Sequence, residues 1–221
     1  MPGPAWGEVA PTDVPIIQAN IRALLVDLHA QAPARVTPDV VLAHDWHRAI
    51  YQGTVSPPGM HCLGAFRGSA DRDLVDFPVS IGNARGEVLA VTPAARDVAG
   101  HLRHLDSAHT AAVGSLDQLI PVATKPTTSG QLEAVVALAA AVHSRWVCIH
   151  PYANGNGRTA RVWANWVALR YGLPPFVRIE PRPDGLLYAQ AAARSMGTPP
   201  SFRDDATLTY SLFLDLLAQK P

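Results

Sequence analysis

Two helical segments separated by a short glycine-containing loop constrain this chain more than any other feature. Residues 132–147 are strongly apolar and rich in alanine, and we expect them to form a helix that is buried nearly all round. A second helical pattern runs from about residue 157 to 171 and ends at Gly172, with Pro174 and Pro175 beyond it. The sequence therefore predicts a helical core in which the intervening loop lies between two helix ends.

The rest of the chain adds further helices and one hairpin. Residues 1–15, with several prolines and glycines, are expected to be an irregular arm, and 16–221 one domain, since the sequence has no repeat or low-complexity tract. Residues 79–91 hold two β-prone runs around a Gly/Asn turn, which predict a hairpin. Thr92 is expected to cap a helix that Pro93 opens. The expected fold class is mainly α, a helical bundle with a small β-hairpin. Its other helices are expected over residues 16–28, 39–51, 184–195 and 207–219.

The composition excludes several classes of function. Lys+Arg 18 balances Asp+Glu 18, which argues against nucleic acid as the main partner. Lys125 and Lys220 are the two lysines, and no Gly-Lys-Ser/Thr sequence exists, so a P-loop is excluded. Cys62 and Cys148 indicate reduced thiols rather than a disulfide framework. The start lacks a signal-peptide pattern and the longest apolar run, residues 134–142, is shorter than the ~18 residues of a membrane span. We therefore expect a cytoplasmic protein with no membrane partner.

The loop between the two core helices carries the residues best suited to chemistry. It reads Ile-His-Pro-Tyr-Ala-Asn-Gly-Asn-Gly-Arg-Thr-Ala-Arg. Gly155 and Gly157 permit a tight turn that brings backbone N–H groups close to a ligand, and the start of the second helix favours an anion. Arg158 and Arg161 are three residues apart, so they share a face at this helix end and complete a phosphate cradle. Because His150 suits general-base catalysis near neutral pH, the loop predicts transfer of a phosphorus group onto a hydroxyl.

Residues 150–161 resemble the signature of the Fic (filamentation induced by cAMP) domain family of the Fic/Doc superfamily, His-Pro-Phe-x-Asp/Glu-Gly-Asn-Gly-Arg-x-x-Arg. Two fixed positions differ: Tyr152 replaces Phe and keeps an aromatic ring, whereas Asn154 replaces the acidic residue. The resemblance extends more weakly over residues 40–217 and includes the Gly-x-x-Arg segment at 64–67. It implies a Fic-type helical bundle whose hairpin is a flap.

The resemblance also implies an activity, the transfer of AMP from ATP onto a Ser, Thr or Tyr hydroxyl of a target protein. His150 would be the base that deprotonates this hydroxyl. The residues implied to hold the phosphates are Gly155, Asn156, Gly157, Arg158 and Arg161. The related Doc kinases have Ala and Lys where this chain has its two glycines, so the resemblance favours nucleotidyl over phosphoryl transfer.

Asn154 bears on the metal that the resemblance implies. In the family, the acidic residue at this position binds the Mg²⁺ that bridges the phosphates. An amide oxygen is still a hard ligand, but it is neutral. We therefore expect Mg²⁺ as a cofactor that is bound more weakly than by a carboxylate.

The resemblance implies two kinds of protein partner. The flap would hold an extended segment of the target as an added strand, through Ile81, Gly82, Val88 and Leu89. Many relatives carry an inhibitory helix, Ser/Thr-x-x-x-Glu-Gly/Asn, but none of the four glutamates lies in this context. They are Glu8, Glu87, Glu133 and Glu180. Inhibition by a separate antitoxin-like partner and control by other means both stay open.

The residues also leave alternatives to AMP transfer. The donor could be another phosphate-linked group, such as UMP, GMP, phosphocholine or phosphate. With Asn154 in place of the acid, the chain could instead be a degenerate module that binds nucleotide without turnover, although a module that only binds would not need His150. Separately, His44 and His47 lie three apart on an expected helix and could hold a metal, but no cluster supplies the third and fourth ligands that such a site needs.

Overall fold

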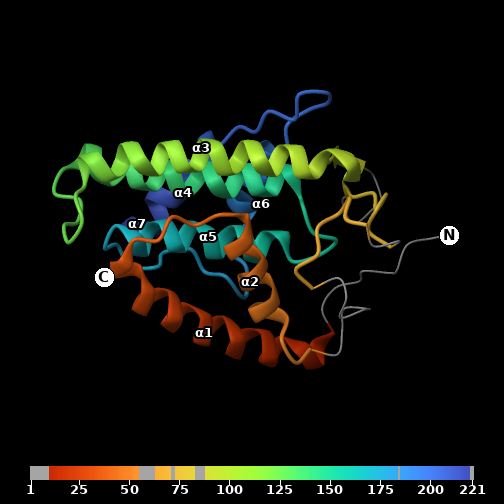
Figure 1. Cartoon of the computed structure of the whole chain (residues 1–221), viewed down its shortest axis with the longest axis horizontal. Helices are drawn as coiled ribbons and strands as arrows, with labels where there is room; N and C mark the ends of the chain where they lie inside the picture. The colour runs from red at the N-terminus through yellow and green to blue at the C-terminus, as the bar shows by residue number, and fades with distance from the viewer. Residues whose placement is uncertain (1–9, 55–62, 71–72, 83–87, 184, 220–221) are drawn as a thin grey trace.

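The computed structural model describes residues 10–54, 63–70, 73–82, 88–183 and 185–219. They form a bundle of helices with a two-stranded sheet at one end (Figure 1). This is the fold class that the sequence predicts. The elements are η1 (Pro11–Asp13), α1 (Val14–Gln31), η2 (Ala32–Ala34), α2 (Val40–Tyr51), β1 (Ser80–Gly82), β2 (Val88–Val91), η4 (Ala95–Asp97), α3 (Val98–Leu119), α4 (Ser129–Ile149), α5 (Asn156–Arg170), α6 (Leu186–Ser195) and α7 (Thr207–Ala218).

Helix α4 is the centre of the bundle and packs against α3, α5, α6 and α7. Its start is set locally, because the Thr128 hydroxyl accepts a hydrogen bond from the Gln131 backbone N–H at 3.2 Å. By length and composition α4 could cross a membrane, but 61% of its most apolar 18-residue window is buried inside the protein. Such burial is typical of the core helix of a globular domain.

The helix that is buried nearly all round is α5 rather than α4, contrary to the expectation from apolar content. Every residue of α5 from Thr159 to Arg170 is buried. The sequence of α5 is less apolar than that of α4, yet a polar side chain such as Asn165 is buried because it finds hydrogen-bond partners inside the core. Asn165 donates to the Val177 carbonyl at 2.7 Å and accepts from the backbone N–H groups of Phe176 and Val177 at 3.0 Å. The segment that follows α5 is thereby folded back along it.

Two expected boundaries differ in the structure. The chain is already helical from Pro11, within the stretch expected to be an irregular arm, because proline at the first helical positions is pre-organised for a helix. The predicted Thr92 cap is wrong, since regular helix starts with η4 at Ala95. The Thr92 hydroxyl instead donates to the Val79 carbonyl at 3.0 Å and so closes the base of the hairpin.

The hairpin is antiparallel, as expected, with Ser80 opposite Val91 and Ile81 opposite Ala90. Its register is irregular between Ile81 and Gly82. Ile81 packs against the core, whereas the side chain of Val88 is 62% exposed. The turn between the strands lies outside the described residues.

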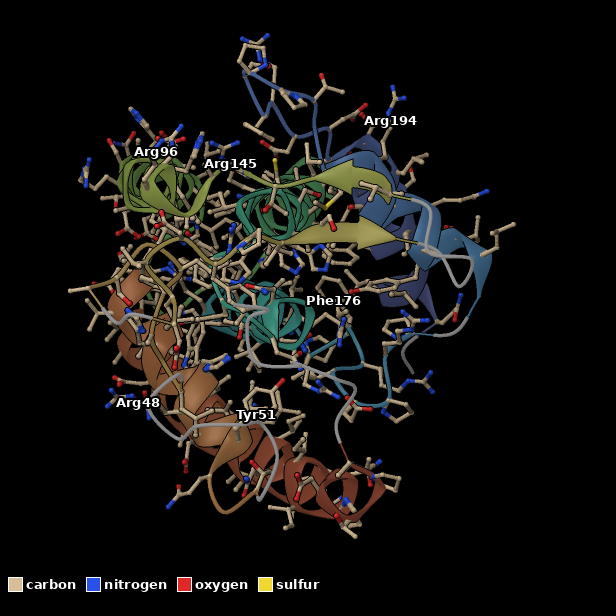
Figure 2. All side chains as sticks on the ribbon, turned by 90° about the vertical axis from the view of Figure 1, so that its right-hand side faces the viewer. Arg48, Tyr51, Arg96, Arg145, Phe176 and Arg194 are labelled. Atoms are coloured by element: carbon tan, nitrogen blue, oxygen red, sulfur yellow. The ribbon has the colours of Figure 1, made fainter. Side chains whose placement is uncertain are left out.

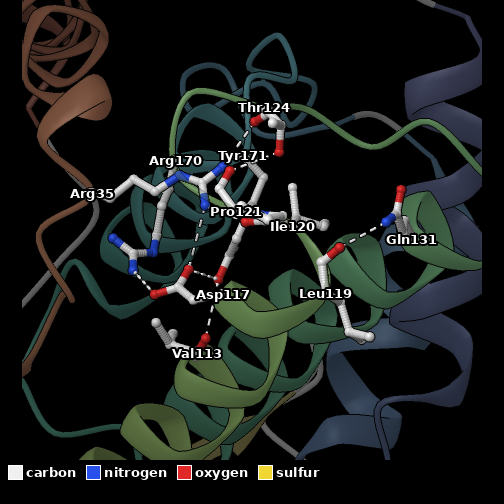
Figure 3. A network of polar contacts seen from close by, with 10 residues as sticks. All are labelled: Arg35, Val113, Asp117, Leu119, Ile120, Pro121, Thr124, Gln131, Arg170 and Tyr171. Carbon is white, nitrogen blue, oxygen red and sulfur yellow. Dashed lines mark hydrogen bonds and ion pairs between the residues drawn. The ribbon is translucent and has the colours of Figure 1, made fainter.

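The far end of the bundle is fastened by one carboxylate, that of Asp117 on α3 (Figure 3). It accepts from Arg170 of α5 at 2.5 Å and from the Tyr171 hydroxyl at 3.0 Å, and it lies 3.7 Å from Arg35. Arg35 also donates to the backbone carbonyls of Ile120 and Thr124. The C-terminal end of α5 is therefore tied to α3 and to the chain that follows α1.

Candidate active site

The loop between α4 and α5 is closed by its own side chains. Asn156 is buried, accepts from the Tyr152 backbone N–H at 2.8 Å and donates to the Tyr152 carbonyl at 2.7 Å. Gly155 has a φ of +84°, which favours glycine. A β-carbon there would lie 2.7 Å from the Tyr51 hydroxyl and 2.8 Å from Nε2 of His47. The loop thus packs closely against α2, and the hydrogen bonds of the Asn156 side chain hold its conformation.

The N-terminus of α5 opens toward a cavity with its first N–H groups unused by the helix. The first backbone bond within α5 runs from Thr159 to the Gly155 carbonyl at 3.0 Å, which leaves the N–H groups of Asn156, Gly157 and Arg158 without an intrahelical acceptor. In the described part of the chain, no side chain caps this end. Backbone donors and the helix dipole together favour an anion here.

His150 lies at the C-terminal end of α4 in a left-handed conformation, with a φ of 51°. Such strain in a residue other than glycine is common at functional sites. Its Nδ1 lies 3.2 Å from the Val147 carbonyl, and because a carbonyl only accepts, Nδ1 carries the proton and Nε2 has a lone pair. Burial and the nearby charge of Arg67 lower the pKa of His150 to about 4. The imidazole is therefore neutral at pH 7 and able to accept a proton.

Arg67 fixes the backbone of His150. Its Nε donates to the His150 carbonyl at 2.8 Å, and its two terminal nitrogens donate to the carbonyls of Ile149, Phe77 and Pro93 and to the Thr92 hydroxyl at 3.1–3.2 Å. The backbone N–H of Arg67 donates to the Pro151 carbonyl at 2.8 Å. The side chain is buried, which lowers its pKa to about 10, and it remains charged at neutral pH. One guanidinium thus joins the end of α4 to the base of the hairpin.

The two signature arginines are held by the segment that is folded back along α5. Arg158 donates to the Glu180 carboxylate at 2.6 Å and to the Tyr51 hydroxyl at 3.0 Å. Arg161 donates twice to the Ile179 carbonyl, at 3.1 and 2.9 Å, and to the Tyr188 hydroxyl at 2.6 Å. Both arginines are therefore already hydrogen-bonded within the protein. Arg161 donates to the Ile179 carbonyl and Arg158 to the neighbouring Glu180 carboxylate.

A cavity of about 700 Å³ brings most of the predicted residues together. The hairpin contributes Ser80 and Ile81, and Glu180 and Arg182 enter from the segment after α5. The predicted residues that line it are His150, Asn154, Gly155, Asn156, Gly157, Arg158, Arg161 and Ile81. Val88 of β2 is not part of this lining, whereas Gly82, at the end of β1, and Leu89 of β2 have no described side chains to compare with it. Figure 2 looks onto this end of the molecule, with Tyr51 projecting from α2.

Three residues of this region escape sequence reasoning because they are distant along the chain. Tyr51 and His47 reach the loop from α2, and Glu180 reaches Arg158 from 22 residues away. The spacing of His44 and His47 suggests a metal, but the described residues hold no group of three or more His, Cys, Asp or Glu side chains placed to bind one. The sequence does contain one clue to Glu180. It has four glutamates, so each of them is a candidate partner for the signature arginines.

The chain is a helical bundle with a small hairpin, in which His150 and the N-terminus of α5 line one cavity. The profile of the Fic/DOC family matches residues 36–168, more than half of the chain. The chain therefore belongs to the Fic/DOC family. A Fic domain containing signaling protein from Bacteroides thetaiotaomicron superposes with a TM-score of 0.64 at 23% identity, over 91% of this chain and 68% of that one. The BepC protein of Bartonella tribocorum, solved with bound AMPPNP, gives a TM-score of 0.54 at 14% identity, over 90% of this chain and 85% of that one. These two structures share the fold.

Two curated relatives match over short stretches. A uridine 5'-monophosphate transferase of Xanthomonas campestris pv. campestris is 48% identical over 40 residues, 18% of this chain and 8% of that protein. A protein adenylyltransferase Fic of Nematostella vectensis is 41% identical over 58 residues, 26% of this chain and 14% of that protein. The matched stretches thus span a small part of both relatives, and these relatives are named for transfer of different nucleotides.

Proposed function

We propose that this protein is a Fic-type nucleotidyltransferase that moves AMP from ATP onto a Ser, Thr or Tyr hydroxyl of a target protein. The observation that carries the proposal is the position of His150. Its Nδ1 is held by the Val147 carbonyl, its Nε2 has a lone pair, and its side chain lines the cavity into which the N-terminus of α5 opens. A base and an anion site therefore share one cavity.

In the proposed step, the target hydroxyl oxygen forms a bond to the α-phosphorus of ATP while Nε2 of His150 takes the hydroxyl proton. The bond between the α-phosphorus and the oxygen bridging to the β-phosphate breaks, and pyrophosphate leaves. The backbone N–H groups at the start of α5 would hold the α- and β-phosphates, where negative charge develops. Arg158 would assist them, and Arg161 would contact the γ-phosphate.

Mg²⁺ would be held in this cavity mainly by the phosphates of the nucleotide. The protein oxygen that fits is Oδ1 of Asn154, which lines the cavity and accepts from the Gly155 N–H at 2.6 Å. A hard, neutral oxygen beside phosphates suits Mg²⁺, although a carboxylate would bind it more tightly. When bound, the ion would neutralise charge on the phosphates.

The target would dock by β-strand addition. Among the described residues β1 pairs with β2 alone, and Ser80 and Ile81 of β1 line the cavity next to His150. An extended segment that pairs with the other edge of β1 would bring its hydroxyl toward Nε2 of His150. Main-chain pairing gives affinity with little demand on sequence.

The deciding experiment compares the wild type with His150→Ala in a lysate supplied with α-labelled ATP and Mg²⁺. We expect labelled protein, self-labelled enzyme included, to fall by about 100-fold or more, because a general base contributes 10²–10⁴ in rate. ATP affinity, measured by calorimetry, should stay within about threefold, since His150 is not placed to hold phosphate. His104→Ala, at an exposed position on α3, is the matched control.

The same experiment separates the alternatives. Labelling from UTP, GTP or CDP-choline but not from ATP would replace AMP with another donor group. Label from γ-labelled ATP alone would indicate phosphate transfer. Binding of ATP with no His150-dependent label from any of these donors would contradict transferase activity and leave a module that only binds nucleotide.

Glu180 is expected to oppose nucleotide binding. Its carboxylate accepts from Arg158 at 2.6 Å inside the cavity proposed for phosphates, so a bound phosphate must compete with it. Glu180→Gln should therefore tighten ATP binding about tenfold, which corresponds to one charge-assisted hydrogen bond. Calorimetry checks this against Glu133→Gln, an exposed glutamate on α4. Weaker binding by Glu180→Gln would show instead that Glu180 orients Arg158 for the nucleotide.

A further inference from the structure

His47 is a buried histidine of α2 whose two ring nitrogens are both occupied. Its Nδ1 lies 3.0 Å from the backbone nitrogen of Gly64, and its Nε2 lies 3.0 Å from the Asn154 carbonyl oxygen. The side chain is 3% exposed, and its ring stacks on that of Tyr152 with centroids 3.9 Å apart. Three separate parts of the chain therefore meet on one imidazole.

The contacts of His47 admit a single protonation state. A backbone N–H can only donate, so Nδ1 accepts from Gly64 and carries no proton. A carbonyl can only accept, so Nε2 carries the proton and donates to Asn154. Burial lowers the pKa of His47 to about 4, in agreement with a neutral ring.

His47 connects the two halves of the candidate active site. Gly64 begins the segment that carries Arg67, and Arg67 holds the backbone of His150. Asn154 begins the turn at Gly155 that leads into the N-terminus of α5. Within the described part of the chain, His47 lies outside the lining of the cavity and contacts the turn that leads into it.

We propose that His47 is a positioning residue that fixes the Asn154–Gly155 turn, and with it the anion-binding end of α5, relative to His150. The hydrogen bond from Nε2–H of His47 to the Asn154 carbonyl determines the position of the turn. The Nδ1 acceptor fastens the ring to the segment that leads to Arg67. The consequence for turnover rests on the proposed nucleotide transfer, whereas the consequence for the turn itself does not.

Two substitutions separate the two halves of the ring. In His47→Gln, the side-chain amide nitrogen reaches the position of Nε2 and can donate to Asn154. In His47→Asn, the amide oxygen can accept from Gly64, but the Asn154 carbonyl loses its donor. Both variants lose the stacking on Tyr152, so a purely structural role predicts equal effects. We expect His47→Asn to weaken ATP binding about tenfold and to lower His150-dependent labelling further, while His47→Gln stays within about threefold of the wild type.

Amide hydrogen exchange tests the turn without nucleotide. The Tyr152 amide, which donates to Asn156, and the Thr159 amide, which donates to the Gly155 carbonyl, report whether the loop is closed. They should exchange about tenfold faster in His47→Asn than in His47→Gln. His29→Asn, exposed at the end of α1, is the control. Equal exchange and equal ATP affinity in the Asn and Gln variants would overturn the proposal. If labelling fails in the wild type, the transferase proposal falls, and the exchange rates still decide the role of His47.

Discussion

Replacing Gly155 with alanine is expected to lower nucleotide transfer by about 100-fold or more, as a displacement of about 1 Å at a reacting group does. Gly155 has a φ of +84°, which costs an L-residue about 1–2 kcal/mol. The new methyl group would also lie 2.7 Å from Tyr51 and 2.8 Å from His47, closer than any real contact. Since α2 is packed in the core, the turn must move instead, and the N-terminus of α5 moves with it.

The initial rate of labelling and the ATP affinity measure this effect. Gly114→Ala is the matched control, because a methyl group in that turn of α3 meets nothing within 4 Å. It should leave the rate unchanged and raise the free energy of unfolding by about 0.5–1 kcal/mol, as alanine does in a helix. Wild-type turnover in Gly155→Ala would contradict the view that α2 sets the position of the turn.

Arg67→Met is expected to give the largest loss of stability, about 3–5 kcal/mol. The variant keeps an unbranched apolar stem but removes five side-chain hydrogen bonds to acceptors at the end of α4 and at the base of the hairpin. For a domain of this size, about 2–4 °C per kcal/mol makes the midpoint of thermal unfolding fall by roughly 6–20 °C. Urea denaturation and a thermal scan measure the effect.

Arg67→Lys tests whether charge or geometry matters. Lysine retains the charge but has one nitrogen that cannot reach acceptors arranged around a planar fork, so we expect an intermediate loss. Arg103→Met, at an exposed position on α3, should change the free energy of unfolding by less than about 0.5 kcal/mol. A loss below about 1 kcal/mol in Arg67→Met would show that water or other donors replace the guanidinium.

Elements with local determinants could be predicted from the sequence. Asp39 caps α2 by accepting from the Leu42 N–H at 2.9 Å, and the predicted helix starts at that residue. His150 and the start of α5 likewise line one cavity because they are neighbours along the chain, within the loop that the sequence singles out.

Contacts between distant segments could not be predicted in the same way. Arg67 lies 83 residues from His150, and His47 lies 107 residues from Asn154, and no periodicity reports such pairs. The burial of α5 depends on a contact of the same kind. Asn165 finds partners in the core because the segment after the helix folds back against it. The spacing of polar and apolar residues predicts a helix, but the burial of that helix depends on which other segments pack against it.

The fastening of α5 at both ends restricts how this protein can adapt to a ligand. The turn before α5 packs closely against α2 at Gly155. At the other end, Arg170 of α5 pairs with Asp117, which also pairs with Arg35. A helix fixed at both ends cannot tilt to widen the cavity. Any widening of the cavity for a larger ligand must therefore come from the segment around Glu180 or from the hairpin, which both contribute to its lining.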